Sequence, residues 1–170
     1  MSRSLKAMKH VVSFVVLAAV TLSAFLVSPS SAADLAINPN TVFFSSNAKY
    51  THGTAGASIA IGDLVYLDVT DNKWKLADAN LSLAASKVQG VASTAAVSGQ
   101  RVYICYEDPG FNCGQFTGGG TVFVLSTNPG KIAPSADIVS GMYVSVVGVG
   151  TTNSGATMNF KITRCDTLKP

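Results

Sequence analysis

Short runs of alternating apolar and polar residues are the feature that most constrains this chain. The segment GDLVYLDVTDNKWKLAD, residues 62–78, contains two such runs: Val65 and Leu67 share a face of the first, and Trp74 and Leu76 a face of the second. A period of two is typical of strands, and the turn-forming pair Asp71–Asn72 between the runs predicts a β-hairpin. The alternation returns in RVYICY, TVFVLS, MYVSVVGV and MNFKIT, with Gly and Pro in the gaps. The Ala-rich residues 77–88 are the only helical candidate, so the sequence predicts an all-β fold.

An internal repeat organises these strands. A shift of 58 residues lays GDLVYLDVTDNKW, from Gly62, over GTVFVLSTNPGKI, from Gly120, and lays Gly90 over Gly148. The match predicts two pseudo-repeated four-strand units, at about residues 62–106 and 120–164. Each unit needs a partner for its apolar face, so we expect them to pack as a compact β-sandwich or barrel within a domain of residues 53–170.

Two segments precede this domain. Residues 33–52 have weak periodicity and many Ser and Thr, which predicts an extended N-terminal arm or an edge strand. Residues 1–32 combine a basic start, an apolar run and the small residues SPSSAA, a pattern typical of a secretory signal. A single membrane anchor and a start of translation further downstream are the alternatives.

The residues that catalysis and charge-driven binding need are scarce. Of 12 basic residues Arg3, Lys6 and Lys9 precede the arm, which leaves nine against nine acidic residues and a net charge of zero. That balance argues against nucleic-acid binding. His52 is the only histidine after residue 32, and the single glutamate, Glu107, adjoins Asp108 in a predicted turn. We therefore predict no enzyme, no catalytic, cofactor or metal site, and no small-molecule substrate.

Three groups of residues have a structural and a functional interpretation. The oxygens of Asp68, Asp71 and Asn72 suit calcium, but their spacing lacks the closing glutamate of a calcium loop and favours turn hydrogen bonds. A sugar-binding face of aromatic side chains is the second case, and their alternation with other apolar residues favours the core instead. Its members would be Trp74, Tyr66 and Phe123.

The third group is the cysteines, Cys105, Cys113 and Cys165, whose spacing matches no zinc site. YICYEDPGFNC places Cys105 and Cys113 on either side of a predicted Pro-Gly turn. If the chain is exported, a disulfide between them is plausible, whereas a reducing compartment would keep them as thiols.

Several segments together resemble the small head-decoration, or cement, proteins of tailed bacteriophages. They are ADLAI, GTAGASIAIGDLVYLD, KWKLADA, VQGVA and VFVLSTNPGKIAPSADIVSGMYVSVVGVG, which lie between residues 33 and 150. The resemblance implies a virion protein that binds the major capsid protein on the outside of the head, forms a homotrimer and stabilises the shell. In that interpretation the arm supplies contacts to the capsid or a neighbouring subunit, from Asp34, Leu35, Ile37, Val42, Phe43 and Phe44.

The leader does not belong to that pattern and supports a second hypothesis. An exported β-sandwich module, secreted or periplasmic, would bind a protein or glycan ligand and be stabilised by the Cys105–Cys113 disulfide.

Overall fold

The computed structural model describes residues 33–114, 119–151 and 157–168, and residues 162–168 through their backbone alone. The predicted leader, residues 1–32, lies outside this part of the chain. The regular structure of the described residues consists of strands and two short 3₁₀ turns, so the all-β prediction is confirmed. The elements are η1 (Pro39–Thr41), β1 (Lys49–Thr54), β2 (Leu64–Asp68), β3 (Lys73–Leu76), β4 (Gly90–Ala92), β5 (Arg101–Asn112), β6 (Val122–Leu125), β7 (Ile132–Pro134), η2 (Ser135–Asp137), β8 (Tyr143–Gly150) and β9 (Thr157–Leu168).

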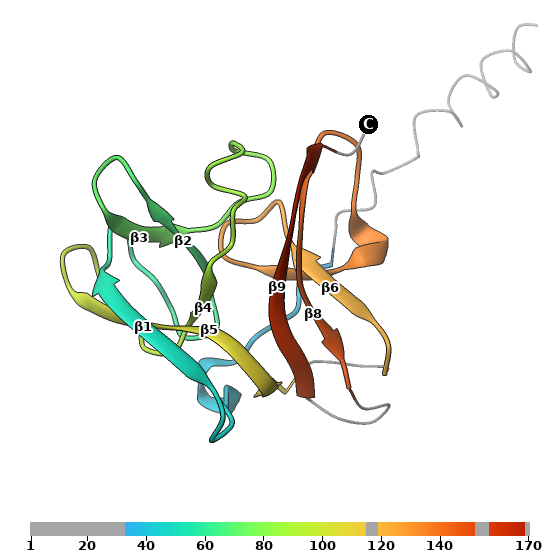
Figure 1. Cartoon of the computed structure of the whole chain (residues 1–170), viewed down its shortest axis with the longest axis horizontal. Helices are drawn as coiled ribbons and strands as arrows, with labels where there is room; N and C mark the ends of the chain where they lie inside the picture. Colours follow the sequence, from blue (N-terminus) through green and yellow to red (C-terminus); the bar gives the residue numbers. More distant parts are fainter. Residues whose placement is uncertain (1–32, 115–118, 152–156, 169–170) are drawn as a thin grey trace, which may run out of the picture. The chain divides into compact units, whose positions relative to one another are not determined.

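Strand order reveals the duplication directly. The antiparallel sheet runs β3-β2-β4-β5-β9-β8-β6-β7, with β1 paired to β5 outside this path. The order is symmetric about its centre. Counted inward from the two ends, β3 corresponds to β7, β2 to β6, β4 to β8 and β5 to β9. The two units meet in the centre, where β5 pairs with β9 (Figure 1). The predicted pair of four-strand units is thus confirmed as one sheet that curls on itself.

The repeat extends to backbone conformation. Gly62 and Gly120 both have positive φ, 90° and 83°, and so do Asn72 and Gly130, 55° and 77°. Each pair is 58 residues apart, the spacing found in the sequence. Glycine and asparagine tolerate this left-handed region best, so these residues mark the same turns in both units. Equivalent backbone hydrogen bonds recur as well: Gly62 N to Ala92 O and Gly120 N to Gly150 O, Ala92 N to Asp63 O and Gly150 N to Thr121 O.

The predicted hairpin is present, and its turn is held by charge. Val65 faces Leu76 and Leu67 faces Trp74 across β2 and β3. Lys75 Nζ lies 2.7 Å from Asp68 Oδ2 and 3.0 Å from Asp71 Oδ2, while backbone amides donate to both aspartates. These carboxylates therefore support the turn, as the structural interpretation of the sequence predicts.

We expect the pKa of Asp68 to lie well below that of an ordinary aspartate. The hydrogen bond from Lys75, followed by that from the Thr70 amide, lowers its pKa from 3.8 to about 2. Because the folded value is the lower one, the stabilisation from Asp68 is present above pH 3.8 and is lost as the pH falls through about 2. Carboxyl chemical shifts in an acid titration measure this value. In Lys75→Met the pKa of Asp68 should return towards 3.8, and an unchanged pKa would contradict the assigned cause.

Strand β2 is buried on both of its faces, and this divides the apolar interior in two. Val65 and Trp74 lie in a smaller core, whereas Leu64 and Tyr66 belong to a larger one that also contains Phe123. The aromatic side chains Trp74, Tyr66 and Phe123 are therefore core residues, as the alternation favours. Residues 77–88, the one helical candidate, form turns between β3 and β4 instead.

The smaller core fills a nearly closed five-stranded barrel. The path β3-β2-β4-β5 continues into β1, and Ala55, directly after β1, bridges back to Trp74 in β3. The Gly56 amide donates to the Trp74 carbonyl at 2.7 Å and so joins the two ends. This arrangement brings β1, β3 and β5 together around the site described next.

Candidate functional site

The predicted contact residues of the arm are mostly used within the chain itself. Leu35, Ile37, Val42 and Phe44 pack against the larger core, and the Leu35 amide donates to the Ile132 carbonyl. Asp34 accepts a 2.6 Å hydrogen bond from Asn128 Nδ2. Only Phe43 among the six points outward, with 64% of its surface exposed. Residues 49–52, predicted as the end of the arm, belong to strand β1 of the sheet. Contact between this segment and a capsid stays a prediction.

A buried carboxylate ties the arm to β5. Asp108 is fully buried and accepts hydrogen bonds from the Ser45 amide at 2.9 Å, from the Ser45 hydroxyl and from the Gly110 amide at 2.9 Å. The sequence predicts a turn at Asp108 and gives no sign of this role. The carboxylate organises an irregularity in β5 between Asp108 and Phe111 instead.

The predicted turn at Pro109–Gly110 is wrong, and the disulfide that the sequence left open depended on this turn. Both residues lie inside β5, which runs unbroken from Arg101 to Asn112. Cys105 lies within this strand and Cys113 directly follows it, so about eight residues of extended chain, roughly 25 Å, separate them. A disulfide needs Cα atoms within about 7 Å. Both cysteines are buried, and no disulfide joins these two described residues. Burial, reinforced by nearby Asp108, raises the pKa of Cys105 to about 12, which makes this thiol a poor nucleophile.

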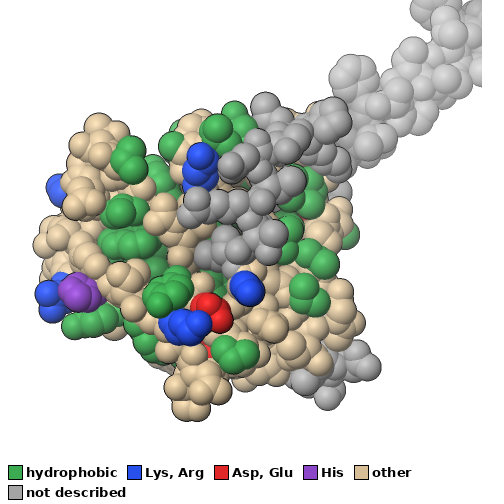
Figure 2. Space-filling model, viewed as in Figure 1, with side chains coloured by type: hydrophobic (Ala, Val, Ile, Leu, Met, Phe, Trp, Pro, Cys, Tyr) green, Lys and Arg blue, Asp and Glu red, His purple; other side chains and the backbone are tan. Residues whose placement is uncertain are grey.

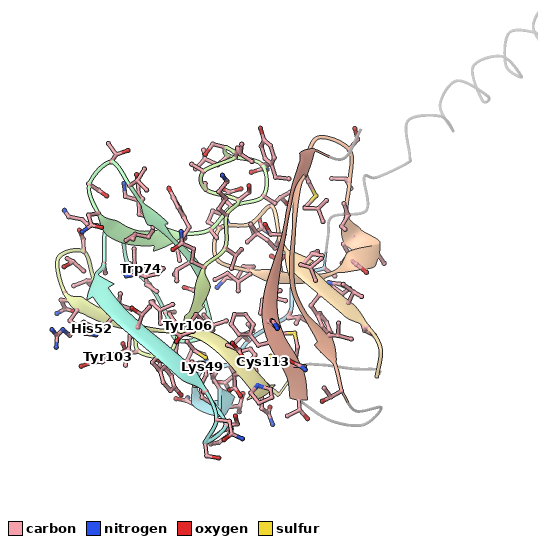
Figure 3. All side chains as sticks on the ribbon, in the orientation of Figure 1. Lys49, His52, Trp74, Tyr103, Tyr106 and Cys113 are labelled. Carbon is pink, nitrogen blue, oxygen red and sulfur yellow. The ribbon has the colours of Figure 1, made fainter. Side chains whose placement is uncertain are left out.

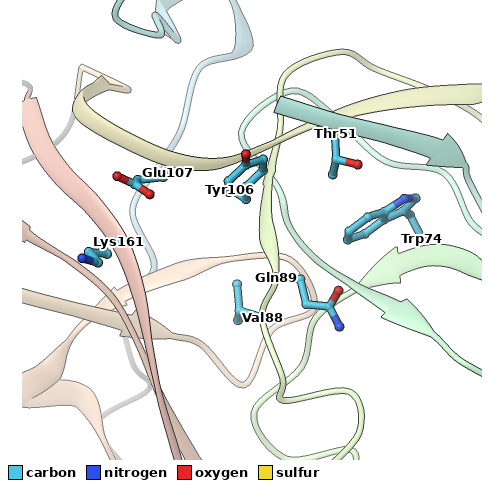
Figure 4. Close-up of a pocket in the computed structure, with 7 residues that line it drawn as sticks. All are labelled: Thr51, Trp74, Val88, Gln89, Tyr106, Glu107 and Lys161. Carbon is cyan, nitrogen blue, oxygen red and sulfur yellow. The ribbon is translucent and has the colours of Figure 1, made fainter. Parts of the chain in front are cut away.

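A groove lies between β1, β3, β5 and β9, and we call it the Trp74 groove (Figure 4). Its volume is about 490 Å³, within the range of about 300–1,000 Å³ typical of ligand sites. Its lining combines two aromatic rings, one aliphatic side chain and four polar groups: Thr51, Trp74, Val88, Gln89, Tyr106, Glu107 and Lys161.

The two aromatic rings of the groove are held differently. Trp74 is 6% exposed, because strand β1 crosses it: a Cβ at Gly53 would lie 2.7 Å from the indole Cδ1. Tyr106 is 43% exposed on β5 and presents much of its ring to solvent. Tyr103 on the same strand is 42% exposed but lies outside the groove, where its ring packs against His52 with centroids 5.6 Å apart (Figure 3). His52 is a surface residue.

Most polar groups of the groove are available to a ligand. Within the described part of the chain, the side chains of Thr51, Gln89, Tyr106 and Lys161 make no hydrogen bond or ion pair. Glu107 pairs with Lys49, Nζ to Oε2 3.1 Å, on the exposed rim. Lys161 is the backbone partner of Glu107 across β5 and β9, so one anionic and one cationic side chain line the groove.

An apolar hollow adjoins this groove, and Gln89 lines both. This Leu83 groove has a volume of about 430 Å³ and is lined by Tyr66, Leu67, Asp68, Val69, Thr70, Leu83, Ala84, Lys87 and Gln89. Val69 in this lining is 89% exposed, and Leu81 in the same loop as Leu83 is 70% exposed. On the face drawn in Figure 2, hydrophobic and neutral side chains predominate and charged ones are few.

Neither groove could be read from the sequence, because each is assembled from distant segments. The one usable signal was the alternation in RVYICY, which puts Tyr106 two residues after Ile104 on the barrel side of β5.

No cluster of three or more metal-ligating side chains occurs among the described residues. Within the described ranges, no helix is both long enough and apolar enough to cross a membrane. The sequence matches no protein-family model and no curated protein.

Proposed function

We propose that this chain is a capsid decoration protein, which binds the major capsid protein on the outer surface of a phage-type head and stabilises the shell. The observation that carries the proposal is a body without net charge after residue 32, whose surface exposes large apolar side chains at many places. Ten described residues contribute: Phe43, Tyr50, Val69, Leu81, Leu83, Val97, Tyr103, Tyr106, Val139 and Val149.

Such a surface suits attachment by repetition. Each apolar contact is weak, but a symmetric oligomer on a symmetric shell makes many of them at once. After the first subunit binds, the other subunits are held close to their own sites at a high effective concentration, which raises the total affinity. A homotrimer at three-fold positions of the head would present three copies of the surface. The curled sheet supports this role as a rigid scaffold, since its two units bury each other's apolar faces.

The Leu83 groove with Val69 and Leu81 is the surface we assign to the capsid. It groups the most exposed aliphatic side chains next to an apolar hollow, and it is formed by β2, the turn after it and the turns between β3 and β4. The arm, whose apolar residues cover the chain's own core, contributes through Phe43.

Gradient-purified particles from cells that produce the full chain test this proposal. We expect the chain to co-sediment with heads in stoichiometric amounts by quantitative mass spectrometry. The double variant Val69→Ser, Leu81→Ser should bind heads with a dissociation constant raised at least about tenfold, or 1.4 kcal/mol. Val139→Ser, which changes an exposed apolar residue that does not line the Leu83 groove, should bind as the parent does. Absence from particles together with processed protein outside the cytoplasm would refute the proposal and favour the exported module.

A further inference from the structure

We infer that the Trp74 groove is a binding site for a neutral saccharide, an activity distinct from attachment to a capsid. The inference rests on the position and chemistry of the groove residues and does not require the proposed function. A protein that attaches through the Leu83 groove would keep the Trp74 groove available for a second ligand, apart from their shared residue Gln89.

Aromatic rings supply the first part of the argument. Sugar rings have apolar C–H faces that pack on aromatic side chains, and amphipathic aromatics suit sites that are half wet and half apolar. Tyr106 presents an exposed ring from β5, and the edge of Trp74 forms the opposite wall, from β3 (Figure 4). The backbone of β1 lies against the indole, so Trp74 is fixed by the barrel and its position is set before a ligand arrives.

Hydrogen-bonding groups supply the second part. A hydroxyl-rich ligand both donates and accepts, and therefore needs side chains of both kinds. The Gln89 amide and the Thr51 and Tyr106 hydroxyls provide donors and acceptors, and within the described residues they have no side-chain partner of their own. They come from β5, β1 and the loop before β4, so they approach a ligand from different sides.

Charge decides between ligand classes. Lys161 and Glu107 both line the groove and have opposite signs, and Lys49 on the rim is paired with Glu107. Among the described residues of the groove, Lys161 alone carries an unpaired charge, whereas phosphorylated or sulfated ligands would require several cationic groups. A hydrophobic ligand would leave the polar side chains of the groove unpaired, which costs free energy. A neutral, hydroxyl-rich ligand fits both the rings and the polar groups.

The chain contains its own reporter for this site. Trp74 is the only tryptophan of the 170 residues, so its fluorescence reports on the groove alone. The full chain is titrated with methyl glycosides of glucose, galactose, mannose and N-acetylglucosamine and with the corresponding disaccharides. We expect a saturable change in Trp74 emission with at least one of these probes at millimolar concentration.

Two tyrosines on one strand give a matched pair of variants. Tyr106→Ala removes the exposed ring of the groove, and we expect the dissociation constant to rise at least about tenfold. Tyr103→Ala removes an equally exposed ring from the same strand outside the groove, and binding should be unchanged. Far-ultraviolet circular dichroism of each variant verifies the fold.

Three results would overturn the inference. The first is no saturable change with any probe, and the second is equal loss of binding in the two tyrosine variants. The third is a response to charged sugars, such as glucose 6-phosphate or glucosamine, with none to neutral ones. Particle association is measured separately, so failure of the saccharide site and failure of the capsid proposal are distinguishable.

Discussion

Asp108→Ala is expected to lower the free energy of unfolding by about 3 kcal/mol and to detach the arm from the sheet. The carboxylate accepts from two backbone amides, those of Ser45 and Gly110, and from the Ser45 hydroxyl. Alanine would leave these donors without an acceptor next to the buried core, at about 1–3 kcal/mol for each unsatisfied group. Urea denaturation measures the stability, and limited proteolysis measures exposure of residues 38–47.

Ser45→Ala is the matched control for this prediction. It removes the hydroxyl but keeps both amide hydrogen bonds to Asp108, so we expect a loss of only about 1 kcal/mol and no faster proteolysis. Equal losses in the two variants would show that the amide contacts contribute little. A stable Asp108→Ala protein with a protected arm would refute the anchoring role.

Gly90→Ala is expected to cost about 3 kcal/mol, the upper range for overpacking, because strands β4 and β5 meet there without space for a side chain. A Cβ at this position would lie 2.6 Å from the Cys105 carbonyl oxygen and closer still to the Ile104 side chain. The backbone oxygen cannot rotate away, so β4 must separate from β5. The equivalent Gly148 should respond in the same way, since its Cβ would lie 2.8 Å from Met158 Cγ and press on the Asn159 carbonyl oxygen.

Gly99→Ala separates crowding from backbone strain. Nothing lies within 4 Å of a Cβ at Gly99, but its φ of +87° is unfavourable for alanine. That strain costs about 1–2 kcal/mol. Thermal or urea unfolding of the variants should therefore rank Gly90 and Gly148 as more sensitive than Gly99. If Gly99→Ala proved the most destabilising, the close approach of the paired strands would not be the reason for these glycines.

The strands and the repeat were predictable because both depend on local or periodic features. Alternation located the β2–β3 hairpin and the later strands, and the 58-residue shift anticipated the recurrence of Gly62 at Gly120. Asn72 and Gly130 illustrate why the shift works: their identities differ, but both allow the positive φ that the turn needs. Equivalent positions of the two units keep residue types that allow the same backbone conformation, so the repeat is detectable even where few residues are identical.

The error at Pro109–Gly110 has an equally physical origin. This dipeptide favours turns in isolated segments, but here it lies within a long strand whose irregularity is stabilised by Asp108. Pairing with β9 and burial of Asp108 outweigh the local preference. Once the strand continues through this point, Cys105 and Cys113 are too far apart to be linked.

The sequence by itself determined the all-β class, the hairpin, the two-unit organisation and the neutral charge of the body, because period, turn chemistry and composition are properties of neighbouring or regularly spaced residues. Only the tertiary structure decided that β2 is buried on both faces, that the arm covers the chain's own core, and that Thr51, Trp74, Gln89, Tyr106 and Lys161 surround one groove. These depend on how far the sheet curls and on which distant strands pair, and long-range pairing leaves no pattern within any one segment.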